Sequence, residues 1–245
     1  MRLDAAIADA AGRLSHTSDS ARLDAEILLC QTIDMPRSYL FAHPEDELDS
    51  LTLDRFEALM QRRLDGEPMS YITGTREFWS HELLVSRATL VPRPETELLV
   101  ELALRAIPRS AEWQILDLGT GSGAIAIAIA AERLMCTVTA TDISADALAV
   151  ARENARNADL SNLICIAGSW TTPVAGLAFD VIVSNPPYVR DDDEALRNLR
   201  YEPLSALASG KDGLNDIRIL ASDSTEILAE GGWLMLEHGA DQARD

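Results

Sequence analysis

Cysteine, basic residues and long hydrophobic runs are all scarce in this sequence, and each scarcity excludes a class of protein. The 245 residues include only three cysteines, which have apolar neighbours and no Cys-x-x-Cys spacing. This pattern is typical of buried thiols in a reducing compartment and argues against a disulfide framework or a bound metal ion. The longest uncharged apolar stretch, residues 118–131, is rich in glycine and shorter than the roughly 18 residues that span a membrane.

Basic residues are outnumbered by acids, 21 against 40, which gives a formal net charge of −19. Arg62-Arg63 is the only adjacent basic pair. An acidic surface of this size repels phosphate backbones, so we expect no direct binding of nucleic acid. Asp4 and Asp9 interrupt the N-terminus, which therefore lacks the core of a signal peptide. The sequence predicts a soluble, cytoplasmic protein with no membrane partner, and we expect it to be a monomer.

Three segments of the chain differ in pattern. Residues 1–70 show helical periodicity, with Ser20 placed to cap one helix and a second amphipathic run between Leu51 and Leu64. Because this segment carries no glycine loop or metal-like cluster, we predict a small helical domain whose task is substrate recognition. Residues 71–90 contain two short apolar runs separated by a polar turn, a pattern that predicts a β-hairpin linker. Residues 91–245 predict a separate α/β domain.

Strands alternate with helices in this last segment. Its opening string, Pro92 to Glu97, combines proline with acids, which is typical of a helix N-terminus. The alternation predicts a mostly parallel sheet covered by helices on both faces, the Rossmann-like α/β class. The predicted strands are residues 115–118, 137–141, 163–167, 179–184 and 233–237, and the predicted helices are 124–132, 145–157 and 217–228.

The first motif is a glycine-rich loop after the first of these strands, Asp117-Leu118-Gly119-Thr120-Gly121-Ser122-Gly123. Such a loop lets a ligand touch the backbone closely. Asp142 ends the next strand, where a carboxylate can accept hydrogen bonds from both hydroxyls of a ribose. A loop and acid of this kind can also bind NAD, but the Gly-x-Gly-x-Gly spacing favours S-adenosylmethionine. Trp170, after the third strand, is a candidate to cover the adenine face, although a core position would suit it equally.

The second motif is Asn185-Pro186-Pro187-Tyr188, directly after the predicted strand 179–184. A planar nitrogen is a poor nucleophile because its lone pair is delocalised. The side-chain oxygen of Asn185 and the backbone carbonyl of Pro186 can accept its two N–H bonds, orient its lone pair and stabilise positive charge on it. The prolines hold these acceptors still, and Tyr188 can lie on the amide plane. The four residues are therefore catalytic candidates for transferring a methyl group from S-adenosylmethionine to an amide or amino nitrogen.

From about residue 66 onward the sequence resembles the protein-(glutamine-N5) methyltransferases that modify class I peptide chain release factors. The string Pro92 to Glu97 is the most discriminating match, because general amino-methyltransferases lack it. The other matching stretches are Gly66-Glu67-Pro68, Tyr71-Ile72-Thr73-Gly74, the loop 117–123, Asp142-Ile143-Ser144, Asn185-Pro186-Pro187-Tyr188, Glu202-Pro203 and Ala206-Leu207.

This resemblance implies a Rossmann-like sheet that uses S-adenosylmethionine, with a small N-terminal helical domain and no metal. It implies that the glutamine of a Gly-Gly-Gln motif in the release factor is held by Asn185 to Tyr188. The implied cofactor contacts are Gly119, Thr120, Gly121, Ser122, Gly123, Asp142, Trp170 and Asn185.

The sequence departs from the family pattern in two places. Ser169 precedes Trp170, where family members usually carry an acid that can bond the adenine amino group. The chain also stops at Asp245, soon after the strand 233–237, whereas the family continues into two more strands. We therefore expect residues 91–245 to be a C-terminally truncated methyltransferase domain.

Two other functions remain open from the sequence alone. An adenine-N6 DNA methyltransferase resembles this chain in its Asn-Pro-Pro-Tyr chemistry, but it would have to bind phosphates and flip a base, which the net charge of −19 opposes. A noncatalytic scaffold with a degenerate methyltransferase fold is the second alternative. The intact motifs at residues 119–123 and 185–188 argue against it.

Overall fold

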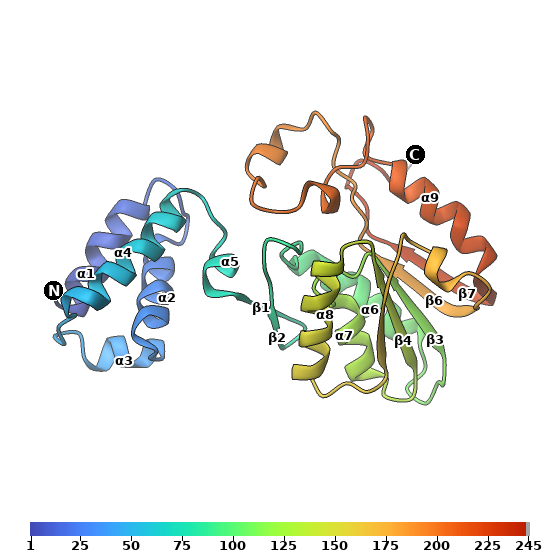
Figure 1. Ribbon diagram of the computed structural model, residues 1–245, viewed down its shortest axis with the longest axis horizontal. Helices are drawn as coiled ribbons and strands as arrows, with labels where there is room; N and C mark the ends of the chain where they lie inside the picture. The colour runs from blue at the N-terminus through green and yellow to red at the C-terminus, as the bar shows by residue number, and fades with distance from the viewer. Residues whose placement is uncertain (244–245) are drawn as a thin grey trace. The chain divides into compact units, whose positions relative to one another are not determined.

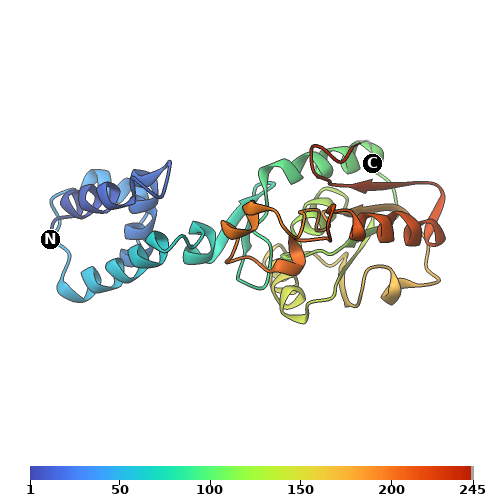
Figure 2. The same cartoon turned by 90° about the horizontal axis from the view of Figure 1, so that it is seen from above.

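The computed structural model describes residues 1–243, which divide into two compact units (Figures 1 and 2). The first unit is Met1–Gly74, and the second begins at Thr75. No helix among the described residues is long and apolar enough to cross a membrane.

The first unit consists of helices packed on a small apolar core. Residues from α1, α2 and α4 dominate this core, with Leu14, Leu28 and Phe56 almost fully buried. Ser20 precedes α2 as predicted, but its hydroxyl donates to Asp24 and does not cap the backbone. The helices are α1 (Leu3–Leu14), α2 (Ala21–Ile33), α3 (Arg37–Ala42), α4 (Ser50–Leu64) and α5 (Met69–Thr73).

The second unit opens with a β-hairpin in which β1 (Thr75–Phe78) pairs antiparallel with β2 (His81–Leu84). Its turn residues Trp79 and Ser80 have φ of 50° and 61°, the left-handed geometry of a tight two-residue hairpin turn. Asn154 ties the hairpin to the rest of this unit: its Oδ1 accepts the Leu84 N–H at 2.7 Å and its Nδ2 donates to the Leu84 carbonyl at 2.9 Å. The hairpin is thus part of the second compact unit.

A parallel sheet of five strands in the order β5-β4-β3-β6-β7 forms the centre of the second unit (Figure 1). This arrangement confirms the predicted Rossmann-like α/β class. The strands are β3 (Gln114–Leu118), β4 (Thr137–Asp142), β5 (Leu163–Ala167), β6 (Phe179–Ser184) and β7 (Leu228–Leu236). The helices are α6 (Glu97–Ala106), α7 (Ala124–Glu132), α8 (Ala145–Asn157) and α9 (Asn215–Asp223), with short 3-10 turns η1 (Pro94–Thr96), η2 (Thr172–Val174), η3 (Glu194–Arg197), η4 (Leu204–Ala206) and η5 (Ser224–Glu226).

Apolar layers on both faces of the sheet explain why its central strands are uniformly hydrophobic. Ile115 of β3 packs with α6 and α7 on one face, whereas Leu116 and Leu118 pack with α9 and η2 on the other. This alternation follows from the two-residue period of a strand. All three side chains are fully buried. This packing holds β3 in place, so its carboxyl end is a rigid support for the loop that follows it.

The last helix and strand differ from the prediction. The helix predicted over 217–228 is α9, which ends at Asp223, and η5 follows it. The strand predicted from Trp233 begins at Leu228, and its pairing with β6 is irregular between Phe179 and Val181. Gly231, with φ of 76°, lies within this irregular stretch, where a glycine accepts a conformation that other residues resist. Within the described residues β7 is an edge strand, and Trp233 is 53% exposed.

Candidate active site

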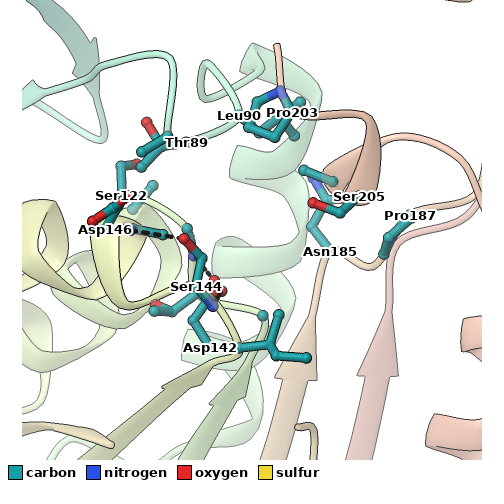
Figure 3. Close-up of a pocket in the computed structure, with 18 of the residues that line it drawn as sticks. Thr89, Leu90, Ser122, Asp142, Ser144, Asp146, Asn185, Pro187, Pro203 and Ser205 are labelled. Carbon is teal, nitrogen blue, oxygen red and sulfur yellow. Dashed lines mark hydrogen bonds between the residues drawn. The ribbon is translucent and has the colours of Figure 1, made fainter. Parts of the chain in front are cut away.

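A cavity of about 370 Å³ lies at the carboxyl ends of β3, β4 and β6. Strand order reverses direction between β3 and β6, and a crevice at such a point is where open α/β sheets bind ligands. Asp142 and Ser144 line one side of the cavity, and Asn185 and Pro187 line the other (Figure 3). The predicted cofactor residues that line it are Gly119, Thr120, Gly121, Ser122, Asp142, Trp170 and Asn185.

The glycine loop leaves room for a ligand. Gly121 has φ of 57°, and a Cβ added there would meet no atom within 4 Å, so its backbone faces open space in the cavity. Gly123 is the one predicted cofactor residue that does not line the cavity. A Cβ on Gly123 would lie 3.3 Å from the Ala151 Cβ, so this glycine permits close packing of α7 against α8.

Asp142 holds the loop in place. Its Oδ2 accepts the Gly121 N–H at 2.9 Å, and its Oδ1 accepts the Ser144 N–H at 2.8 Å. The Ser144 hydroxyl in turn accepts the Ala147 N–H and caps α8. Each carboxylate oxygen keeps a second acceptor position, so Asp142 can also accept hydroxyls from a ligand in the cavity.

A second carboxyl group, that of Asp117, supports the glycine loop through a buried hydrogen bond. Asp117 is fully buried, and the Thr120 hydroxyl donates to its Oδ2 at 2.6 Å. Burial raises the pKa of Asp117 to about 7, although the hydrogen bond from Thr120 acts in the opposite direction. Asp117 therefore carries a proton over a pH range in which an ordinary aspartate has lost it.

Trp170 packs on the glycine loop from the end of β5. A Cβ placed on Gly119 would lie 3.0 Å from the Trp170 ring, so the absence of a side chain at Gly119 lets the ring lie against the backbone. Trp170 has φ of 45°, an uncommon conformation for a bulky residue, and its carbonyl accepts the Thr141 hydroxyl at 3.2 Å. Ser169, the position where the family pattern usually has an acid, is exposed and lines the cavity.

The Asn-Pro-Pro-Tyr segment is anchored at the end of β6. The Ser184 hydroxyl donates to the Leu118 carbonyl at 2.6 Å, and the Ser184 carbonyl accepts the Glu237 N–H at 3.0 Å. The next residue, Asn185, donates from Nδ2 to the Thr96 hydroxyl at 3.1 Å. This side chain is therefore held between the end of β6 and the turn η1.

A second cavity, of about 90 Å³, adjoins this segment. Asn185, Leu90 and Ala206 line both cavities, whereas Pro186 and Tyr188 line only the smaller one. Of the two acceptors proposed from the sequence, Asn185 thus lies where the two cavities meet, and Pro186 lies on the smaller one. Such an arrangement can bring a small planar group in the smaller cavity next to a larger ligand in the other.

Tyr188 borders the smaller cavity and bonds to Glu237. The Tyr188 hydroxyl donates to the Glu237 Oε1 at 3.0 Å. Burial, together with the charge of Glu237, raises the pKa of Tyr188 to about 12, so its ring stays neutral at physiological pH. The other oxygen, Glu237 Oε2, is buried and has no hydrogen-bond partner within the part of the chain that the structure describes.

Sequence reasoning assigned no role to Thr96, Glu202 or Glu237. The buried carboxylate of Glu202 accepts the Val91 N–H at 3.0 Å and pairs with the Arg93 guanidinium. These bonds join the segment that carries the string Pro92–Glu97 to Glu202–Pro203. No local signal in the sequence marks Glu202, because its partners Val91 and Arg93 lie 111 and 109 positions away along the chain.

The residues lining the larger cavity fit S-adenosylmethionine. Gly121 offers bare backbone, Asp142 has spare acceptor positions for ribose hydroxyls, and Trp170 presents an aromatic ring. No group of three or more His, Cys, Asp or Glu that could hold a metal ion occurs among residues 1–243. The fold and these groups define a methyltransferase that depends on S-adenosylmethionine.

Comparison with known proteins identifies the branch of this class. Residues 5–74 match the model of the PrmC N-terminal domain, and residues 94–210 match that of the methyltransferase small domain. A release factor glutamine methyltransferase of Yersinia pestis is 50% identical over 96% of this chain and 84% of its own length. One of Coxiella burnetii is 44% identical over 94% and 83%. The chain belongs to the family of release factor glutamine methyltransferases.

A solved structure supports the fold independently. The S-adenosylmethionine-dependent methyltransferase from Agrobacterium tumefaciens superposes with a TM-score of 0.50, covering 69% of this chain and 53% of that one. At 20% identity this likeness concerns the fold alone.

Proposed function

We propose that this chain methylates the side-chain amide nitrogen of the glutamine in the Gly-Gly-Gln motif of class I peptide chain release factors, using S-adenosylmethionine. The observation that carries this proposal is the position of Asn185 at the junction of the two cavities. The relatives named as release factor glutamine methyltransferases, at 44% and 50% identity over most of the chain, support the choice of substrate.

The larger cavity is the proposed cofactor site. We assign Asp142 to the ribose hydroxyls, the Trp170 ring to the adenine face, and the backbone of residues 119–122 to the rest of the molecule. Bound there, S-adenosylmethionine supplies a methyl group on a positively charged sulfur, which is electrophilic.

The smaller cavity is the proposed entry for the glutamine side chain. An amide nitrogen is a poor nucleophile because its lone pair is shared with the carbonyl. The Asn185 Oδ1 and the Pro186 carbonyl accept its two N–H bonds and so hold the amide plane, which orients the perpendicular lone pair for attack on a methyl group in the larger cavity. Preorganised acceptors of this kind are each worth about 3–4 kcal/mol of the barrier, because they meet positive charge as it develops.

No strong base is needed at the nitrogen. Once it has gained a methyl group the nitrogen is cationic, and its proton is acidic enough to pass to water. Tyr188 remains protonated because its pKa is raised to about 12, so we assign it to packing against the amide plane and not to proton transfer. Pro187, on the larger cavity, keeps the turn between these groups rigid.

We assign residues 1–70 to recognition of the protein substrate. This helical unit has its own core, and its buried acids Asp24 and Glu26 are paired with the arginines Arg63 and Arg37. It contributes no residue to either cavity. A unit that has its own core and lines neither cavity is suited to binding a part of the protein substrate distant from the glutamine.

Mass spectrometry of a release factor incubated with the chain and S-adenosylmethionine tests the function. We expect one added methyl group on the tryptic peptide that contains Gly-Gly-Gln, and none when the glutamine is replaced by alanine. An adenine-containing DNA duplex in a parallel reaction tests the alternative substrate. Methylation of the DNA, or an unmodified peptide under conditions where the chain binds S-adenosylmethionine, would contradict the proposal.

A further inference from the structure

Thr96 contacts the catalytic candidate Asn185 directly. Its side chain lies at the junction of η1 and α6, is 4% exposed, and lines the larger cavity. The Thr96 Oγ1 accepts a hydrogen bond from the Asn185 Nδ2 at 3.1 Å, across 89 positions of sequence. This bond occupies the nitrogen end of the carboxamide and leaves its oxygen end for another partner.

The orientation of that carboxamide decides whether the site can bind an amide substrate. A carboxamide has an acceptor oxygen and a donor NH₂ of nearly equal size, and the torsion that exchanges them is broad and roughly two-fold. If the Asn185 group were rotated by half a turn, its NH₂ would face the NH₂ of a glutamine substrate. Two donors would then oppose each other, and the developing positive charge would meet no acceptor.

The segment that carries Thr96 is held by several bonds. The Thr96 N–H donates to the Arg93 carbonyl at 3.1 Å, and Pro94 restricts the backbone between them. Arg93 and the Val91 N–H both bond to the buried carboxylate of Glu202. The Thr96 side chain is therefore held at a fixed place beside Asn185, where its hydroxyl oxygen accepts the Nδ2–H bond.

We propose that Thr96 is a positioning residue for methyl transfer, whose hydroxyl holds the Asn185 carboxamide in place by its nitrogen end and leaves its oxygen free for the substrate nitrogen. This inference rests on the proposed function for its kinetic consequence. Thr96 acts through Asn185 and contributes no group to the reacting atoms.

The kinetic test compares Thr96→Val, which keeps the shape but removes the hydroxyl, with Thr96→Ser, which keeps the hydroxyl. In single-turnover methylation of a release factor, Thr96→Val should be slower by about tenfold, the factor that one neutral hydrogen bond is worth. Thr96→Ser should retain most of the rate, and because Thr96 lines the larger cavity both variants are compared at saturating S-adenosylmethionine. Thr139→Val, a buried threonine of β4 outside both cavities, controls for the general effect of the substitution.

A double-mutant comparison separates positioning from other roles. In an Asn185→Ala background, Thr96→Val should cause no further loss of rate, because the group that it positions is gone. An undiminished loss in that background, or equal rates for Thr96→Val and Thr96→Ser, would overturn the inference.

A spectroscopic test needs no substrate and so separates this inference from the proposed function. In protein labelled with ¹⁵N-asparagine, the Asn185 side-chain NH₂ signals are those missing from the spectrum of Asn185→Ala. We expect these signals to shift in Thr96→Val and to stay near their original position in Thr96→Ser. Unshifted signals in Thr96→Val would refute the hydrogen bond, even if the parent chain methylates the release factor. The expected shift in a chain that methylates no release factor would leave the bond in place and refute the proposed substrate.

Discussion

Replacing Asp142 with alanine should weaken the binding of both S-adenosylmethionine and its product S-adenosylhomocysteine. In the structure this carboxylate accepts the N–H groups of Gly121 and Ser144 at 2.9 and 2.8 Å, so it anchors the loop as well as facing the cavity. Leaving buried ribose hydroxyls without an acceptor costs about 1–3 kcal/mol. Release of the loop acts in the same direction, so we expect both dissociation constants to rise by about 10- to 100-fold.

Isothermal titration of each ligand measures this effect, and Asp180→Ala is a matched control. The Asp180 Oδ2 also accepts a backbone N–H, that of Gln114 at 2.8 Å, but at the amino ends of β6 and β3. Its removal deletes the same kind of bond at the opposite end of the sheet from the cavity. We expect Asp180→Ala to leave both affinities unchanged.

Two outcomes would refute this reasoning about Asp142. Unchanged dissociation constants for both ligands would mean that the carboxylate has no part in binding the ribose. Weaker binding of S-adenosylmethionine alone would mean that Asp142 acts on the sulfonium charge, because the two ligands share the ribose and differ at sulfur.

Three further predictions concern the remaining groups of the site. Asn185→Ala should lower the methylation rate by on the order of 10²–10³ while S-adenosylmethionine still binds in titration, and near-parental turnover would exclude the proposed acceptor role. Because the pKa of Tyr188 is raised to about 12, the methylation rate of the parent chain and that of Tyr188→Phe should depend on pH in the same way between about pH 8 and pH 10. An ionisation in this range that is seen in the parent chain and absent from Tyr188→Phe would contradict the neutral ring. Burial raises the pKa of Asp117 to about 7, so the folded protein holds a proton there that the unfolded chain releases above about pH 4. The stability that this group contributes is therefore lost as pH rises from about 4 to about 7. In denaturant unfolding, the free energy of unfolding of Asp117→Asn should rise relative to that of the parent chain over this pH range. A difference between the two free energies that does not change with pH would refute the assignment.

The sequence predicted the sheet and the loops at its carboxyl edge because both depend on local patterns. Apolar runs of five or six residues followed by glycine or proline identify β3 and β6 without any knowledge of their neighbours. Parallel pairing then places the ends of these strands at one edge. Gly121, Asp142 and Asn185 accordingly lie around one cavity, as the spacing of the motifs suggested.

The partners of these residues could not be predicted, because they come from distant parts of the chain. Thr96 lies 89 positions before Asn185, Glu237 lies 49 positions after Tyr188, and Glu202 lies 111 positions after Val91. Periodicity indicates which face of an element is buried, but it does not say which loop will cover a given strand end. The departure at β7 has a related cause, since the strand begins in a glycine-containing stretch that lacks the alternation typical of strands.

The string Pro92 to Glu97 acquires a physical explanation from these long-range bonds. General methyltransferases can place an Asn-Pro-Pro-Tyr segment at a strand end, but the carboxamide of its asparagine still has two possible orientations. Here the Arg93 side chain joins the string to Glu202, Pro94 restricts the turn, and the Thr96 hydroxyl meets the Asn185 nitrogen. Each of these tasks requires a particular residue type at a particular position of the turn. The string and the Asn-Pro-Pro-Tyr segment are thus coupled through the Asn185 side chain, so the proposed positioning role of Thr96 gives the string a physical task beside the site.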